Sequence, residues 1–437
     1  MERRVRRPSK LLGTLVVPGD KSISHRAALF NAIADGTARV VNYPDGADCG
    51  ATLACLRDLG VGIEQRPSAE AAAAEGALDL TVHGVGLHGL REPEDILDAQ
   101  NSGTTMRLLL GILAGQPFFS VLTGDASLRG RPMDRVTEPL REMGARITGR
   151  DGGSRAPLGI EGGSLRAIDY RTPVASAQVK SSLLLAGLYA KGTTMVDEPA
   201  DSRDHTERLL AAMGAACGHD GHRAWVGPST LRAVDLRIPG DFSAAAYWLV
   251  AAVLHPNASI RLRGVGINPT RTGLLDTLRA MGANIRVENE RWEGGEPVAD
   301  LWAESSSLEG TEVAGDMIPR LIDEAPVLAV AAALARGTTV IRDAAELRVK
   351  ESDRIATTTA ALRRFGADID ELPDGMVIRG RGSLQGATVA SQGDHRLAMA
   401  LAVAGLLAEG ETVVQDAEAV AVSYPRFWED IHHFTGA

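Results

Sequence analysis

The sequence predicts an α/β protein with two similar domains, each made of three repeated α/β units with buried parallel helices. Three observations lead to this fold class. An amphipathic helical stretch that stops at a Gly recurs along the chain, an almost wholly apolar stretch lies between its copies, and a Pro-Gly-Asp segment near the N-terminus returns near the middle. Such recurrence is the sequence signature of an internally repeated architecture.

The amphipathic stretches are recognised by the glycines at their ends. Five of them end at Gly60, Gly144, Gly214, Gly282 and Gly366. The intervals between these glycines are 84, 70, 68 and 84 residues. Glycine is favoured just after a helix because the chain there often takes a positive φ. The C-terminal segment YPRFWEDIHHF resembles a sixth, shortened copy.

The second kind of helical stretch has no polar face. It occurs at residues 27–34, 104–115, 181–190, 244–254, 324–335 and 397–408. A helix that is apolar all round is buried on every side. Several copies are followed by a short turn and a β-branched run, as in KGTTMV, RGTTVI and EGETVV, which predicts a strand. Each unit therefore reads as a buried helix, a strand, an amphipathic helix and a further strand.

A Pro-Gly-Asp segment that occurs twice divides the six units into two sets of three. VPGDKS at 17–22 is echoed by IPGDFS at 238–243. The midpoint of the repeat accordingly lies near residues 237–241.

Composition and charge exclude several classes of protein. Cys49, Cys55 and Cys217 have no paired spacing, which argues against disulfides and a Cys-based zinc site and favours a reducing, cytoplasmic location. A net charge of −10 opposes a nucleic-acid partner. The apolar run at 397–408 is shorter than the ~20 residues that span a bilayer. No apolar segment follows the basic residues 1–10, so we expect no secretory signal.

Two glycine-containing motifs do not carry a nucleotide site. GVGLHG at 84–89 matches G-x-G-x-x-G, but Pro93 interrupts the helix that a dinucleotide site needs. GDKS at 19–22 lacks the glycine spacing of a phosphate-binding P-loop. No H-E-x-x-H or C-x-x-C spacing suggests a metal.

The starts of the buried helices carry the polar residues. These flanks are GDKSISHR, QNSG, VASAQVK, GDFS, IDEA and GDHR. A helix N-terminus offers free N–H groups and partial positive charge to an anion. Lys21, Arg26, His395 and Arg396 would strengthen an anion site there, so we expect strongly anionic ligands.

Three further charged stretches have two possible interpretations. In LRVKESDRI at 347–355, Lys350 and Arg354 are four residues apart and would share a helical face, either as an exposed salt-bridged helix start or as anion ligands. Cations at a helix N-terminus are disfavoured unless an anion binds, which favours the second. SLRGRPMDR at 127–135 is a basic loop or a clamp, and Asp323 and Glu324 are helix caps or an acid and a base.

Eight of these segments, taken in order, resemble the signatures of the 5-enolpyruvylshikimate-3-phosphate (EPSP) synthase family. They are PGDKSISHRAALF, NSGTTMRLLLG, GDASLRGRPM, SAQVKSSLLLAG, SRDHTERL, IDEAPVLAVAAA, RVKESDRI and GDHRLAMA. The resemblance implies the inside-out α/β barrel of enolpyruvyl transferases. It also implies a first domain at 20–237 on the shikimate 3-phosphate side, a second at 1–19 with 238–437, and an active site in the cleft between them.

The resemblance further implies transfer of the enolpyruvyl group of phosphoenolpyruvate to the 5-hydroxyl of shikimate 3-phosphate, in the shikimate pathway to chorismate and the aromatic amino acids. The shikimate 3-phosphate ligands would be Lys21, Ser22, Arg26, Ser176, Ala177, Gln178, Ser202, Arg203, Asp323 and Lys350. The phosphoenolpyruvate ligands would be Lys21, Gly103, Arg131, Gln178, Glu351, Arg354, His395 and Arg396. The catalytic residues would be Asp323, Glu351 and Lys21. We expect no cofactor or metal, no nucleic-acid or membrane partner, and a monomer.

The chain departs from the family pattern in places. Val422 or Ser423 stands where many members carry a Lys, and Ala177 where some have a second Ser. Gly103 is the small residue at a position linked to inhibitor access, so we expect glyphosate to fit. One alternative is a UDP-sugar enolpyruvyl transferase, which typically has a Cys in the loop DASLRGRPM, where this chain has none. Another is a non-catalytic binder of phosphorylated acids, which would not need Asp323, Glu351 and Lys21 together.

Overall fold

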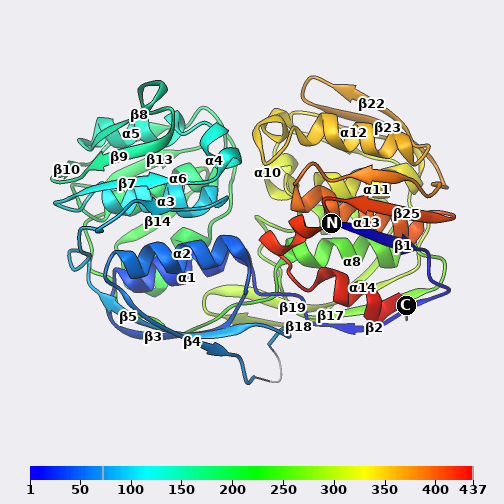
Figure 1. Ribbon diagram of the computed structural model, residues 1–437, viewed down its shortest axis with the longest axis horizontal. Coiled ribbons are helices and arrows are strands. Elements are labelled where there is room, and N and C mark those ends of the chain that lie inside the picture. Colours follow the sequence, from blue (N-terminus) through cyan, green and yellow to red (C-terminus); the bar gives the residue numbers. More distant parts are fainter. Residues whose placement is uncertain (71–72, 436–437) are drawn as a thin grey trace. The chain divides into compact units, whose positions relative to one another are not determined.

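The computed structural model describes residues 1–70 and 73–435, and its internal contacts divide the chain into two units (Figure 1). The N-terminal unit contains residues 19–238 and 292–296. The C-terminal unit contains residues 1–18, 239–291 and 297–437. Each unit has its own hydrophobic core.

The strands of the N-terminal unit repeat one topology three times. The sheets run β16 (Leu236–Arg237), β3 (Asp35–Tyr43), β5 (Leu78–Val85), β4 (Gly62–Pro67); β6 (Leu97–Asp98), β7 (Phe119–Thr123), β9 (Arg155–Glu161), β8 (Arg146–Arg150); and β11 (Asp169–Arg171), β13 (Thr194–Asp197), β15 (Arg223–Val226), β14 (Cys217–Asp220). In each sheet the first pair is parallel and the next two pairs are antiparallel. A short parallel pair joins β10 (Leu165–Arg166) to β12 (Ala190–Lys191).

The C-terminal unit has three corresponding sheets, two of which use strands from the chain's N-terminus. They run β18 (Asn284–Glu293), β19 (Glu296–Glu304), β17 (Ala258–Gly266), β2 (Leu11–Leu15); β20 (Glu312–Val313), β21 (Arg336–Ile341), β23 (Gly375–Arg381), β22 (Asp368–Leu372); and β1 (Glu2–Arg6), β25 (Glu411–Gln415), β24 (Thr388–Ala390). Strand β2 pairs in parallel with β17, and β1 pairs antiparallel with β25. The sixth unit thus has three strands where the others have four.

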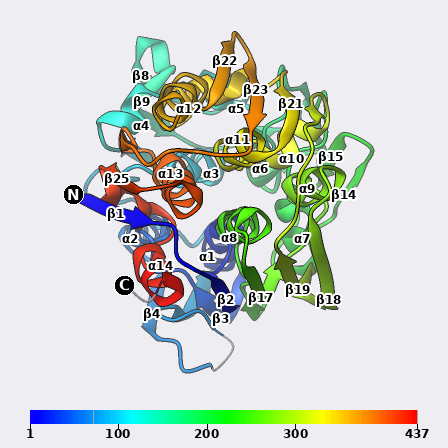
Figure 2. The ribbon, with the colours of Figure 1, turned by 90° about the vertical axis from the view of Figure 1, so that its right-hand side faces the viewer.

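Three helices fill the middle of each unit. They are α1 (Lys21–Ala32), α3 (Gly103–Leu113) and α6 (Ala177–Gly187) in the N-terminal unit and α8 (Phe242–Leu254), α11 (Ala325–Leu334) and α13 (His395–Leu407) in the C-terminal unit. Nearly all their residues are buried, which confirms the prediction from their apolar character. Figure 2 shows α8, α11 and α13 end-on beside one another, with the sheets around them.

Small residues allow these helices to pack closely. A Cβ at Gly111 of α3 would lie 2.2 Å from the Ser182 carbonyl oxygen of α6, so only glycine fits there. This fits a core built with few aromatic residues.

The amphipathic helices follow their predicted pattern. They are α2 (Ala47–Asp58), α5 (Asp134–Met143), α7 (His205–Ala212), α9 (Gly273–Ala280), α12 (Arg354–Arg364) and α14 (Phe427–Thr435). The glycines that follow the first five have φ between 83° and 115°, which confirms their predicted role in ending a helix. Two short helices, α4 (Ala126–Gly130) and α10 (Met317–Leu321), and 3₁₀ turns at Asp151–Gly153, Ala345–Val349 and Ala417–Val422 complete the fold.

One local prediction is wrong. Lys350 and Arg354 do not share a helical face, because α12 begins only at Arg354. The Asp353 side chain caps the helix by accepting from the Ala356 N–H at 3.1 Å, and the preceding 3₁₀ turn ends at Val349. Lys350 therefore lies in the connection between the two helices. The predicted basic loop at 127–135 is also largely helical, since α4 and the start of α5 occupy it.

Candidate active site

The first turn of α1 places two predicted site residues, Lys21 and Ser22. The Asp20 carboxylate caps this helix by accepting from the Ile23 N–H at 2.9 Å. Lys21 Nζ lies 3.2 Å from Asp48 Oδ2, and both side chains are largely buried. On Ser22, the hydroxyl accepts a 3.3 Å hydrogen bond from Arg203 Nη1. The α1 start therefore presents a lysine held by a carboxylate beside a serine held by an arginine.

Arg26, one turn further along α1, is buried among hydroxyl groups. Its Nε donates to Thr206 Oγ1 and its Nη2 to Ser181 Oγ, both at 2.7 Å, while Nη1 donates to the Ser22 carbonyl oxygen at 2.9 Å. Burial, partly offset by the nearby Glu207 carboxylate, lowers the pKa of Arg26 to about 10. These bonds join α1 to α6 and α7.

The start of α3 holds Gln178 in a defined orientation. Arg107, which is buried, donates from Nη1 to Gln178 Oε1 at 2.6 Å. Gln178 Nε2 donates to Thr104 Oγ1 at 2.9 Å. A Cβ at Gly103 would lie 2.7 Å from Arg107 Nη1. The small size of Gly103 therefore leaves room for the arginine that orients Gln178.

Arg131 lies just after α4. Its Nη2 donates to Asn101 Oδ1 at 2.7 Å and to Ser127 Oγ at 3.2 Å, and the residue is only 8% exposed. This links Arg131 to the segment that leads into α3.

The start of α6 and the loop before α7 are joined by a single carboxylate. Ser176 precedes α6 and donates its backbone N–H to Glu198 Oε1 at 2.8 Å. Ser202 Oγ donates to Glu198 Oε2 at 2.7 Å. Ala177, the first residue of α6, contributes no polar side-chain atom. Two predicted serine ligands are thereby brought together through Glu198.

In the C-terminal unit, Arg354 binds three carboxylates. Its Nε donates to Asp394 Oδ2 at 2.8 Å, its Nη2 to Glu351 Oε2 at 2.6 Å and its Nη1 to Asp323 Oδ1 at 3.2 Å. The guanidinium is 1% exposed. Burial alone would lower the pKa of Arg354, but Asp394, Glu351 and Asp323 outweigh it and raise that pKa well above its ordinary value. Arg354 is therefore a permanent cation.

Three more predicted residues surround this cluster. Arg396 Nη2 lies 3.7 Å from Asp323 Oδ2, and nearby acidic groups, Asp323 first among them, raise the pKa of Arg396 despite burial. Lys350 makes no hydrogen bond or ion pair with residues 1–70 or 73–435, and burial lowers its pKa although Asp323 and Glu351 partly offset this. His395 begins α13 and is buried beside Asp394.

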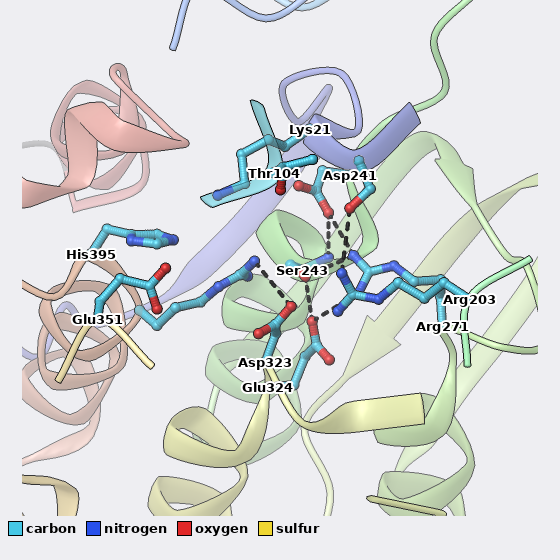
Figure 3. Close-up of polar contacts among 12 residues, drawn as sticks. Lys21, Thr104, Arg203, Asp241, Ser243, Arg271, Asp323, Glu324, Glu351 and His395 are labelled. Carbon is cyan, nitrogen blue, oxygen red and sulfur yellow. Dashed lines mark hydrogen bonds and ion pairs between the residues drawn. The ribbon is translucent and has the colours of Figure 1, made fainter. Parts of the chain in front are cut away.

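A second polar cluster lies beside Asp323 (Figure 3). Arg271 Nη2 donates to Ser243 Oγ at 2.8 Å and lies 3.2 Å from Asp241 Oδ1. The Ser243 hydroxyl donates to Glu324 Oε1, and Arg271 Nη1 lies 3.8 Å from the same oxygen. Glu324 therefore points to Arg271 while its neighbour Asp323 points to Arg354 and Arg396.

Comparison with known proteins identifies the family to which this arrangement belongs. The family model described as EPSP synthase (3-phosphoshikimate 1-carboxyvinyltransferase) matches residues 5–431. The chain belongs to the EPSP synthase family. The resemblance read from the sequence is thereby confirmed.

Individual relatives are similar over nearly their whole length. The 3-phosphoshikimate 1-carboxyvinyltransferase of Herpetosiphon aurantiacus is 54% identical, with 98% of each chain covered. That of Gloeobacter violaceus is 57% identical, with 97% of this chain and 96% of the relative covered. A solved EPSP synthase structure from Acinetobacter baumannii is 44% identical, has a TM-score of 0.86, and matches 99% of this chain and 98% of that one. These matches confirm the predicted two-domain α/β fold.

For this EPSP synthase family member, several residues that hold the predicted ligands in place were not predicted from the sequence. Arg107, Lys180 and Glu198 contact predicted ligands but were not singled out. Arg107 and Lys180 could have been noticed, because each is a charged residue within an otherwise apolar helix. Glu198 had no such signal, since it lies in the connection between β13 and α7, where an acidic residue is ordinary.

Two negative findings apply to the described part of the chain. No helix within it has both the length and the apolar character required to cross a bilayer. Within the same residues, no group of three or more His, Cys, Asp or Glu side chains could hold a metal ion.

Proposed function

We propose that this protein transfers the enolpyruvyl group of phosphoenolpyruvate to the 5-hydroxyl of shikimate 3-phosphate and releases phosphate. Membership of the EPSP synthase family supports the reaction. The comparisons do not favour a UDP-sugar acceptor, and a binder without catalysis would not explain the relatives' printed names.

One observation carries the chemical argument: Asp323 is a carboxylate held among cations. Its two oxygens face Arg354 at 3.2 Å and Arg396 at 3.7 Å, and it is the first of the charges that favour protonated Lys350. A base in cationic surroundings can take a hydroxyl proton while the cations bind phosphate and carboxylate groups.

The reaction then runs by addition and elimination. Asp323 takes the proton of the 5-hydroxyl group while the hydroxyl oxygen forms a bond to C2 of phosphoenolpyruvate. At the same time C3 gains a proton, which gives a tetrahedral ketal. Loss of a C3 proton and cleavage of the C2–O bond to phosphate restore the double bond. Glu351 and Lys21 exchange the proton at C3, and the arginines stabilise the departing phosphate. Since Lys21 and Glu351 belong to different units, the proposal requires both units to contribute to one substrate complex.

The substrate ligands of the proposal fall into two sets. For shikimate 3-phosphate they are Lys21, Ser22, Arg26, Ser176, Ala177, Gln178, Ser202, Arg203, Asp323 and Lys350. For phosphoenolpyruvate they are Lys21, Gly103, Arg131, Gln178, Glu351, Arg354, His395 and Arg396. One chain supplies all of them, so we propose a monomer, which light scattering of the purified protein tests.

Phosphate release on mixing the protein with both substrates, with each omitted in turn, tests the reaction. Release that requires both, together with a new enolpyruvyl ether at the 5-oxygen by NMR, is expected. Binding of either substrate without release would contradict the proposal and leave a binding protein.

A further inference from the structure

Lys180 is a buried lysine of α6 whose three donors are matched by three acceptors. Its Nζ lies 2.9 Å from Glu198 Oε2 and 2.8 Å from Glu207 Oε1, and it donates to the Ser202 carbonyl oxygen at 3.4 Å. The three charged side chains are 5% exposed or less. An ammonium group has three N–H donors, so this arrangement satisfies it fully.

The cluster is nearly neutral once Arg26 is included. Two carboxylates and one ammonium leave one surplus negative charge, and Glu207 is the leading influence that favours protonated Arg26. Burial alone would lower the pKa of Lys180, but Glu207 and Glu198 outweigh it and raise that pKa. Buried charges persist when they are paired in this way. The charges of the cluster therefore balance, and Lys180 stays protonated at neutral pH.

Glu198 binds both the entry to α6 and the loop before α7. One oxygen accepts from the Ser176 N–H, and the other accepts from the Ser202 hydroxyl as well as from Lys180. Because the Ser202 hydroxyl proton is directed at Glu198, these bonds fix the main chain at Ser202. Arg203 follows directly and donates to the Ser22 hydroxyl.

We propose that Glu198 and Lys180 are positioning residues that set Ser176 and Arg203 for the phosphorylated substrate. This rests on the proposed function, which assigns both residues to shikimate 3-phosphate. Glu198 fixes the entry to α6 and the loop before α7 at one point, and Lys180 holds Glu198 in place. The pair touches neither substrate and acts only through its neighbours.

The test compares Glu198→Gln and Glu198→Asp with the wild type. Gln loses the charge that attracts Ser176, Ser202 and Lys180, while Asp keeps the ion pair but shortens the reach by one methylene. Lys180→Met would strand two buried carboxylates and endanger folding, so the Glu198 variants carry the test. Because hydrogen bonds to a charged group are being lost, we expect the KM and the calorimetric Kd for shikimate 3-phosphate to rise roughly tenfold or more, and the KM for phosphoenolpyruvate to change less than about twofold.

Asp79→Asn is the matched control. Asp79 is a buried, ion-paired carboxylate of β5 in the same unit, bound to Arg39 at 3.1 Å. This variant should lose thermal stability without changing the KM for shikimate 3-phosphate. Folded Glu198 variants with the wild-type KM and Kd would overturn the inference. An inactive wild type in the same assay would instead contradict the proposed function.

Discussion

Replacing Asp323 by Asn tests the proposed 5-hydroxyl base most directly, because the change keeps the shape of the side chain and removes its basicity. The Asn amide oxygen can still accept from Arg354 Nη1, which now lies 3.2 Å from Asp323 Oδ1. Asp394 and Glu351 remain to hold Arg354. The cationic framework should therefore survive, and the loss should fall on catalysis.

The expected loss can be bounded from the role assigned to the residue. A positioned general base contributes roughly 10²–10⁴-fold to a rate, so kcat for phosphate release should fall by that factor. Burial lowers the pKa of Lys350, and the Asp323 charge is the largest effect that raises it again. The Asn variant loses this effect. The pKa of Lys350 should fall further, and any alkaline limb of the rate profile that reports this lysine should move to lower pH.

The assay is the initial rate of phosphate release at saturating concentrations of both substrates, followed by the pH profile. Asp316→Asn is the control, because Asp316 is an exposed carboxylate just before α10 and should tolerate the same exchange. A kcat for Asp323→Asn within about threefold of the wild type would refute the assignment, since that is far below the contribution of a general base.

Three further outcomes are expected. We expect glyphosate to inhibit the wild type, and an unaffected wild-type rate at high glyphosate would contradict this. Gly103→Ala places a Cβ 2.7 Å from Arg107 Nη1. Because such overpacking costs about 1–3 kcal/mol, the glyphosate concentration for half-inhibition of this variant should rise roughly tenfold or more. Arg354→Met removes the cation shared by three carboxylates, of which Asp394 is fully buried, so urea unfolding should show a loss of about 3–5 kcal/mol; an unchanged midpoint would show that the cluster is not stabilising. Burial would raise the pKa of Asp394, but Arg354 outweighs it and the pKa is lowered, so the stabilisation is present above the ordinary value of 3.8 and is lost as pH falls through the lower folded value. Unfolding free energies measured between pH 7 and 3 should show the onset of that loss, and Asp394→Asn should flatten it.

The helices could be predicted because their signals are local. An apolar stretch such as 397–408 can only be buried, and α13 contains all of it except the last residue, Ala408. The helix starts were less accessible. The apolar run of α1 begins at residue 27, but the helix begins at Lys21, because the Asp20 side chain caps it there. Because of this cap, α1 includes polar residues that the apolar pattern alone would leave outside the helix.

The strand pairings could not be predicted in the same way. Strands β1 and β2 pair with β25 and β17, which lie hundreds of residues away in the chain. Nothing in a strand's own sequence names such a partner, since the pairing depends on which faces the rest of the fold leaves open.

Without the family resemblance, candidate site residues could be proposed mainly where a charge stands at a helix start. Lys21, His395 and Arg396 were identified in that way, and Asp323 lies two residues before α11. The wrong helical face for Lys350 and Arg354 shows the limit, because Asp353 capped the helix between them. Residues that act through others, such as Glu198 and Arg107, become visible only when distant segments are brought together.

The acidic composition and the anionic substrates are compatible because the buried cations of the site are held by carboxylates. Arg354 alone binds Asp394, Glu351 and Asp323, and Lys180 binds Glu198 and Glu207. A buried cation without such partners would lose its proton or its position before any substrate arrived. The acidic groups keep the cations charged and fixed, so little reorganisation is needed when a phosphate binds. It follows that removing all the carboxylates that hold a cation should weaken anion binding, even though the change makes the site more positive.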